Sequence, residues 1–290
     1  MDTSRVLPAV VERSISRYLA GIDRSLPGAV VGFYVVGSVA LGAYRERRSD
    51  IDFVAVIDGA VDQQDVRRLR VEHARCMLRT AVDACARRRS PTAGACNGVF
   101  IRHADVGKPV AAITPAAAHI GGRFTTGPVG SDVSPVAWKV LAERGIAVRG
   151  VHPSALGLDW QPESLFAWNL ENLERYWGPW ATSTSWSSRL RFRLRPRWST
   201  AWGVLGAPRL HRTMATGEVV SKEAAGDYAR DVFPRRFEPL IADALAYWRE
   251  ERPPRPAMDP DGRRLATSAF VLHVIESARS LDRSGSSRPA

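Results

Sequence analysis

The sequence predicts an α+β fold in which a mixed β-sheet with flanking helices is followed by an all-α helical domain. Up to about residue 130, short runs rich in valine and aromatic residues alternate with helical segments, a pattern typical of strands and helices packed in layers. Beyond that residue helical periodicity dominates, and eight of the nine tryptophans lie between residues 138 and 202. We therefore expect one domain over residues 1–130, a second over 131–252, and a segment 253–290 that contains a linker, a last helix and a tail.

The elements of the first domain follow from periodicity and from turn residues. Apolar residues recur at helical spacing over residues 4–20, and the sequence SLPG ends that helix. Acidic residues at the start of 62–89 and arginines at its end favour a long helix, because both placements suit the helix dipole. Valine and aromatic residues predict strands at 29–36, 51–57 and 98–103, and the segment PVAAIT at 109–114 as a fourth.

The second domain is predicted to be helical. Gly178 and Pro179 predict a turn within it. We expect the two tryptophans beside this turn, Trp177 and Trp180, to line a cleft and the other tryptophans to form the core. The stretch RPPRPAMDPDG predicts a linker and RSGSSRPA a loose tail. Apolar residues recur at helical spacing in 134–144, 162–177, 199–215, 221–230, 236–250 and 264–281.

The composition is that of a globular protein with an arginine-rich surface. The chain has 290 residues, of which 45% are hydrophobic and 24% charged, and this excludes a disordered chain. Its net charge is +11, and its only lysines are Lys108, Lys139 and Lys222. A basic surface favours partners that carry phosphate, although an arginine-rich genomic composition explains the excess equally well.

Neither a membrane nor a secreted protein is predicted. No apolar run reaches the length of a membrane span, and the N-terminal MDTSRVLPAVVERSI lacks the apolar segment of a signal peptide. Three cysteines cannot all pair with one another, and Cys76, Cys85 and Cys96 lack the spacing of metal ligands. We therefore expect reduced thiols in a cytoplasmic, monomeric protein without a membrane partner.

A polar motif lies between the first two predicted strands, where residues 35–57 are VVGSVALGAYRERRSDIDFVAVI. Side chains at positions i and i+2 of a strand point to the same face, so Asp50 and Asp52 present two neighbouring carboxylates. Two such charges repel each other unless a cation neutralises both. Mg²⁺ prefers hard oxygen ligands and commonly lies between carboxylates and substrate phosphates. Asp50 and Asp52 are therefore the predicted metal ligands.

The residues before the two aspartates suit a phosphate group. Gly37 allows a ligand to approach the backbone closely, and Ser38 begins a helix whose free N–H groups favour an anion. Gly42 is expected to keep the helix and the strand close together. Ser49 can hold a phosphate beside the metal site.

This arrangement resembles the signature of the nucleotidyltransferase superfamily: Gly-Ser, a later Gly, and Ser-Asp-x-Asp before an apolar strand. The stretches VAWKVLAERGIAVRGVHP (136–153) and HRTMATGEVVSKEAAGDYA (211–229) resemble the streptomycin/spectinomycin adenylyltransferases, so the resemblance spans most of residues 30–250. It implies a Mg²⁺-dependent enzyme that moves AMP from ATP to a hydroxyl of a small molecule, an aminoglycoside-type antibiotic first of all. The resemblance also implies that Lys222 contacts the ATP triphosphate, whose β- and γ-phosphates are held by Gly37, Ser38 and Ser49.

Two features depart from that family. Asn97 stands where the resemblance implies a third, catalytic carboxylate, and an amide cannot accept a proton as a carboxylate does. His103 and Asp105, at the far end of the same strand, are the alternative bases. Residues 175–217 contain no Asp or Glu, and the alternating arginines of 189–197 predict an extended basic segment that would repel a polycationic acceptor. Two alternatives therefore stay open: modification of a protein or an RNA, and nucleotide binding without catalysis.

Overall fold

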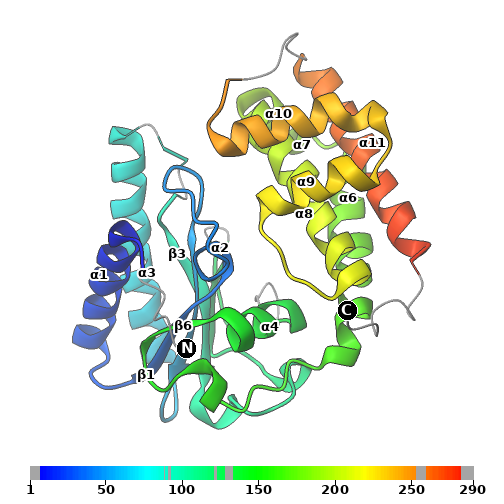
Figure 1. Ribbon diagram of the computed structural model, residues 1–290. Helices are drawn as coiled ribbons and strands as arrows, with labels where there is room; N and C mark the ends of the chain where they lie inside the picture. The colour runs from blue at the N-terminus through cyan, green and yellow to red at the C-terminus, as the bar shows by residue number, and fades with distance from the viewer. Residues whose placement is uncertain are drawn as a thin grey trace. The chain divides into compact units, whose positions relative to one another are not determined.

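The computed structural model describes residues 7–87, 89–90, 93–120, 123–127, 133–252 and 259–281 (Figure 1). The chain divides into two compact units, residues 1–161 and 162–290. The first unit holds a mixed β-sheet with helices, and the second is helical, so the predicted fold class is confirmed. The division falls later than residue 130 because α4 (Pro135–Arg144) and β6 (Ile146–Arg149) belong to the first unit, where β6 pairs with β1.

The described residues form one six-stranded sheet in the order β5-β4-β3-β2-β1-β6. Among these six strands, β2 and β3 are parallel neighbours, and the other neighbours are antiparallel. The strands are β1 (Val30–Val35), β2 (Ile51–Ile57), β3 (Cys96–Arg102), β4 (Ala117–Ile120), β5 (Arg123–Thr125) and β6. The three strands predicted at 29–36, 51–57 and 98–103 are confirmed to within two residues at each end.

The fourth predicted strand is wrong. Residues 109–114 contain the 3-10 turn η2 (Val110–Ala112), and the next strand begins at Ala117. Val110 and Ile113 are buried, so the apolar run packs into the core through a turn rather than through a ladder. A short apolar run cannot by itself distinguish these outcomes.

Helices cover both faces of this sheet, with α1 (Ala9–Ser25) and α3 (Gln63–Ala86) on one face and α2 (Gly37–Ala40) and α4 on the other (Figure 1). Helix α3 begins with a capping box, in which the Asp62 and Asp65 side chains each accept from the other residue's backbone N–H. The core between α1, α3 and the sheet contains Phe33 and Phe53, whose rings stack at 4.8 Å. Short 3-10 turns complete the unit: η1 (His103–Asp105) and η3 (Pro153–Ala155).

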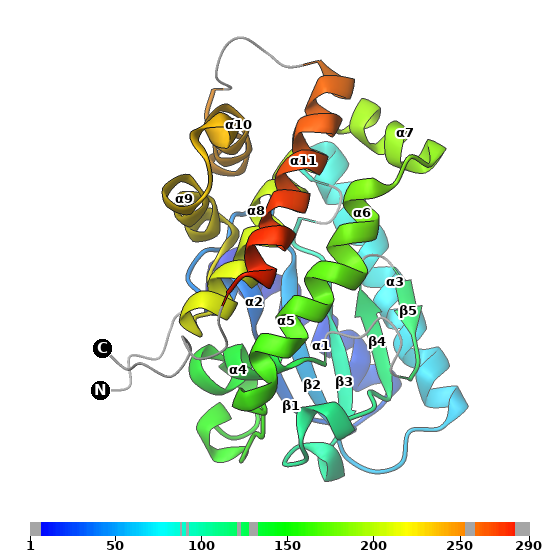
Figure 2. The ribbon, with the colours of Figure 1, turned by 90° about the vertical axis from the view of Figure 1, so that its right-hand side faces the viewer.

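The second unit packs its helices around α8 (Pro196–Thr216), with α11 (Pro260–Arg279) alongside (Figure 2). Its other elements are η4 (Pro162–Ser164), α5 (Leu165–Asn172), a π-helical turn η5 (Leu173–Trp177), α6 (Gly178–Thr182), α7 (Trp186–Leu194), α9 (Lys222–Val232), η6 (Arg235–Phe237) and α10 (Glu238–Arg249). The predicted helices are thus present. The linker and tail lie largely outside the described residues, and the linker's last residues form the first turn of α11.

The turn predicted at Gly178 and Pro179 is wrong. These residues begin α6 directly after η5, and a proline at the start of a helix loses no hydrogen bond. Trp177 is buried, and a Cβ on Gly206 of α8 would lie 2.6 Å from Cζ2 of its ring. A glycine at this position therefore lets the ring lie against the helix backbone. Trp177 therefore belongs to the helical core. Among the described residues no helix combines the length and the apolar character that a bilayer span requires.

Candidate functional site

The Gly-Ser turn lies against the carboxylate of Asp52. Asp50 directly precedes β2 and Asp52 is its second residue. The Val36 N–H donates to the Asp52 carbonyl at 2.9 Å, which fixes the end of β1 beside the start of β2. Gly37 has φ +59°, and a Cβ built on it would lie 2.7 Å from Asp52 Cγ. This position therefore requires glycine for its backbone conformation and for the space that the Asp52 side chain fills.

Ser38 offers a hydroxyl that nothing in the described protein uses. Its Oγ is buried and has no hydrogen-bond partner among the described residues. Buried polar groups are rarely left without partners, and an unpaired one is a candidate for a ligand contact. Helix α2 is a single turn of four residues, so the hydroxyl and not a helix dipole is the feature that suits a phosphate oxygen.

Ser49 and Gly42 belong to the loop between α2 and β2. Ser49 is buried, and its Oγ accepts the Arg45 N–H at 3.1 Å, which closes the loop. A hydroxyl that accepts still carries its own proton, so the predicted phosphate contact of Ser49 stays a prediction. The close packing predicted at Gly42 is wrong: it is exposed, a Cβ on it would meet nothing within 4 Å, and its φ of +69° is what requires glycine.

Asn97 joins the two aspartates at the start of β3. It is the register partner of Asp52 in the parallel pair β2–β3. Its Nδ2 donates to Asp50 Oδ2 at 2.6 Å. Side chains of parallel register partners project from the same face, so Asp50, Asp52 and Asn97 come together at one corner of the sheet. An amide, and not a third carboxylate, occupies this corner.

Two buried histidines behind Asn97 were not predicted from the sequence. His119 of β4 is 1% exposed, and its Nδ1 lies 2.9 Å from Asn97 Oδ1. The His73 ring of α3 lies against it at 3.1 Å between centroids, and Tyr18 lies 3.2 Å from His73 Nδ1. Burial lowers the pKa of His119 to about 4. Burial, together with the charge of His119, lowers the pKa of His73 to about 3, so both rings are neutral at pH 7.

The alternative bases lie elsewhere. His103 and Asp105 belong to η1, which follows the last residue of β3, whereas Asn97 is its second residue. At about 3.3 Å per residue this separation is on the order of 20 Å. Asp105 accepts from Lys108 Nζ at 2.6 Å, and His103 is exposed. Neither residue reaches the corner formed by the two aspartates.

The corner suits a divalent cation that is shared with substrate phosphates better than a metal held by protein ligands alone. The described residues contain no group of three or more His, Cys, Asp or Glu side chains arranged to hold a metal ion. Mg²⁺ is commonly bound by one or two carboxylates together with substrate phosphates. Asp50 and Asp52 supply the carboxylates, Gly37 lies against the Asp52 side chain, and the next residue, Ser38, has a buried hydroxyl without a partner among the described residues. The residues present therefore fit Mg²⁺ bound with a nucleotide.

Lys222 is the first residue of α9, after the Ser221 N-cap. Its Nζ lies 5.0 Å from the ring centroid of Trp202 and 4.6 Å from that of Trp248. Both distances are within the range of cation–π attraction. In the second unit Lys222 is thus held between two indole rings, and its predicted contact with a triphosphate stays a prediction.

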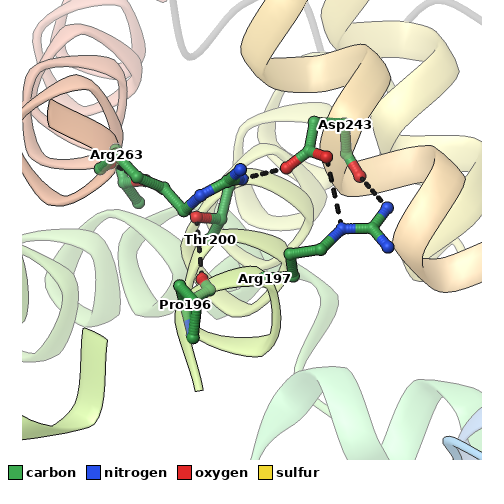
Figure 3. Close-up of polar contacts among 6 residues, drawn as sticks. Pro196, Arg197, Thr200, Asp243 and Arg263 are labelled. Carbon is green, nitrogen blue, oxygen red and sulfur yellow. Dashed lines mark hydrogen bonds and ion pairs between the residues drawn. The ribbon is translucent and has the colours of Figure 1, made fainter. Parts of the chain in front are cut away.

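The extended basic segment predicted at 189–197 is wrong, because helix α7 begins after a Ser185 cap and its Phe192 enters the core. Because successive residues of a helix point in different directions, these arginines have different surroundings. Arg191 lies over the Trp180 ring at 5.2 Å. Arg197, the second residue of α8, donates to Asp243, which also pairs with the buried Arg263 (Figure 3). The arginines left exposed are Arg189, Arg193 and Arg195.

Comparisons with known proteins agree with this geometry. A nucleotidyltransferase domain model matches residues 16–83, and a model of the aminoglycoside adenylyltransferase C-terminal domain matches residues 186–272. The structure of spectinomycin adenyltransferase AAD(9) from Enterococcus faecialis, solved with ATP and spectinomycin, superimposes with a TM-score of 0.65 at 12% identity, covering 91% of this chain and 99% of that one. At this identity the likeness is one of fold. No curated protein sequence matches the chain significantly.

The protein is a nucleotidyltransferase, as the two carboxylates and the Gly-Ser turn of its first unit suggested and the domain match shows. Its second unit makes it resemble the aminoglycoside adenylyltransferases among these enzymes. The family resemblance predicted from residues 35–57 and 211–229 is thereby confirmed.

Proposed function

We propose that the protein transfers AMP from ATP to a hydroxyl of a small molecule, with an aminoglycoside-type antibiotic as the first acceptor class to test. The observation that carries the proposal is the corner where Asp52, with Asp50 two residues before it, lies against the Gly37–Ser38 turn, because two carboxylates suited to a divalent cation are accompanied there by a buried hydroxyl without a partner among the described residues. The match of the second unit to the aminoglycoside adenylyltransferase C-terminal domain supports the acceptor class.

Each residue then has a separate part in the transfer. Asp50 and Asp52 would hold Mg²⁺, which when bound would supply stabilisation of the negative charge on the phosphates. Ser38 donates a hydrogen bond to a phosphate oxygen, and Gly37 leaves room for the Asp52 carboxylate beside the phosphate-binding turn. Ser49 and Lys222 add contacts to the phosphates. Catalysis by positioning and electrostatic stabilisation requires no protein-bound intermediate.

The test is pyrophosphate release from ATP and Mg²⁺ by the purified protein, screened over aminoglycosides that include spectinomycin and streptomycin. We expect release that depends on both the acceptor and Mg²⁺, and mass spectrometry should find the acceptor heavier by one AMP. Asp52→Asn, which keeps the size of the side chain and removes its charge, is the matched inactive control. Absence of acceptor-dependent release across the panel would contradict the small-molecule proposal.

A second candidate is the transfer of a nucleotide to a protein or an RNA. It is favoured by the exposed arginines of α7, which share the helix with Trp186, a side chain that is 75% exposed. Cationic and aromatic side chains on one surface suit a nucleic acid strand. Incubation of a lysate with α-labelled ATP tests this candidate, since label on macromolecules that is lost with Asp52→Asn favours it over the antibiotic.

A third candidate, nucleotide binding without transfer, is favoured by the amide at Asn97. Binding of ATP without label on any acceptor, small or large, would support it.

A further inference from the structure

The hydrogen bonds around Asn97 determine which way its amide points. A carboxylate only accepts hydrogen bonds, so the Asn97 group 2.6 Å from Asp50 Oδ2 has to be the NH₂ group. The carbonyl oxygen Oδ1 then faces His119. Because Oδ1 only accepts, the His119 Nδ1 at 2.9 Å must carry the proton. One chain of donors and acceptors therefore fixes both the amide orientation and the histidine tautomer.

We propose that His119 is a positioning residue for nucleotidyl transfer: its Nδ1–H holds the Asn97 amide so that Asn97 donates to Asp50. The inference rests on the proposed function for its kinetic consequence, although the hydrogen bonds themselves exist without any ligand. His119 is 1% exposed and hydrogen-bonds to Asn97, which in turn donates to Asp50, so His119 acts on the reacting groups through Asn97.

The hydrogen bond from Asn97 fixes the orientation of the Asp50 carboxylate and occupies one of its two oxygens. Oδ2 accepts from Asn97, and this leaves Oδ1 for a divalent cation. A hydrogen-bond partner behind a metal ligand sets its orientation, and loss of such a partner typically costs about 10- to 100-fold in metal affinity or activity. Because Asn97 is an uncharged amide, the corner carries two negative charges, those of Asp50 and Asp52, and a third carboxylate would add one more.

The surroundings of His119 keep its ring neutral. His73 faces it at 3.1 Å between centroids, and a second charge beside the first would be strongly unfavourable. His73 Nδ1 lies 3.2 Å from the Tyr18 hydroxyl, and His119 Nδ1 contacts the Asn97 amide oxygen. A neutral ring has a single proton, and Asn97 fixes it on Nδ1.

The experiment compares His119→Leu, His119→Asn and His73→Leu in the full chain. The amide of asparagine replaces the Nδ1–H donor of histidine, whereas leucine has none. His73→Leu is the matched control, because it removes an equally buried imidazole from the same core and leaves the Asn97 contact in place. Measurements are kcat and KM for ATP, the Kd for Mn²⁺ in the presence of a non-hydrolysable ATP analogue, and the NMR signals of the Asn97 side-chain amide in the free protein.

We expect His119→Leu to lower kcat by about 10- to 100-fold or to weaken Mn²⁺ binding by a similar factor. The Asn97 amide signals should shift, and His119→Asn should restore most of each effect. His73→Leu should lower stability while it leaves Mn²⁺ affinity and the Asn97 signals near their wild-type values. Equal effects of the two leucine variants, or no recovery with His119→Asn, would overturn the inference.

Failure of the proposed function is distinguishable from failure of this inference. If the wild-type protein transfers no nucleotide to any acceptor, the proposed function fails. The Mn²⁺ affinities and the Asn97 signals then still decide whether His119 positions the amide, because neither measurement requires turnover.

Discussion

Replacing Gly37 by alanine tests the turn beside Asp52 most directly. The change has two effects that the structure separates. Alanine at φ +59° costs about 1–2 kcal/mol of backbone strain. In addition, the new Cβ would lie 2.7 Å from Asp52 Cγ, whereas ordinary van der Waals contact begins at 3.4 Å. The carboxylate therefore has to move by about 1 Å, and a misplacement of that size can cost about 100-fold in rate.

Gly42→Ala is the matched control, because Gly42 has a similar φ of +69° and a Cβ there would meet nothing within 4 Å. Urea unfolding should show that both variants lose about 1–2 kcal/mol of unfolding free energy. Pyrophosphate release should show a loss of about 100-fold in kcat/KM for Gly37→Ala alone. If both variants lose activity equally, or if Gly37→Ala stays within a few-fold of wild type, the reasoning about Asp52 is refuted.

Three further predictions concern the corner, the lysine and the buried histidines. Asn97→Asp replaces the amide donor 2.6 Å from Asp50 by a carboxylate, which repels the Asp50 carboxylate. Without divalent ions the variant should therefore unfold at a lower temperature than the wild type, and excess Mg²⁺ should restore the Tm. An unchanged Tm would contradict this reasoning. Lys222→Met keeps an apolar side chain between the two indole rings but removes the charge, so we expect KM for ATP to rise by about tenfold, whereas the exposed Lys108→Met should leave it unchanged. Burial lowers the pKa of His119 and His211 to about 4, below the 6.5 of the unfolded chain, so their stabilising contribution is complete above pH 6.5 and is lost as the pH falls toward 4. Urea unfolding should show a free energy that decreases by about 1.4 kcal/mol per pH unit for each histidine over that range, and a flat profile would show that the rings are already protonated or accessible.

The parts of the site that the sequence predicts are those carried by local patterns. The Gly-Ser pair, the two aspartates and the apolar strands on either side are close in sequence, and β1 and β2 lie where they were expected. The family resemblance places Asn97 at the site as well, and the parallel register of β2 and β3 pairs it with Asp52.

The parts that sequence reasoning missed depend on long-range pairing or on competing periods. His119 lies in a four-residue strand whose place beside β3 becomes apparent only from the sheet order, and nothing local distinguishes it from a core histidine. The alternating arginines after Trp186 imitate the period of a strand. The Ser185 cap and the burial of Phe192 favour a helix instead, because an apolar anchor and a satisfied N-terminus stabilise helical structure more than alternation stabilises an isolated strand.

The position of Lys222 between Trp202 and Trp248 has a practical consequence. An ammonium group close to an indole alters its ultraviolet emission, so the protein contains its own optical probe for the movement of one side chain. If a nucleotide draws the lysine away, the emission of these two rings changes without any attached dye. Titration of ATP into variants that lack one ring or the other would then report which indole the ammonium leaves.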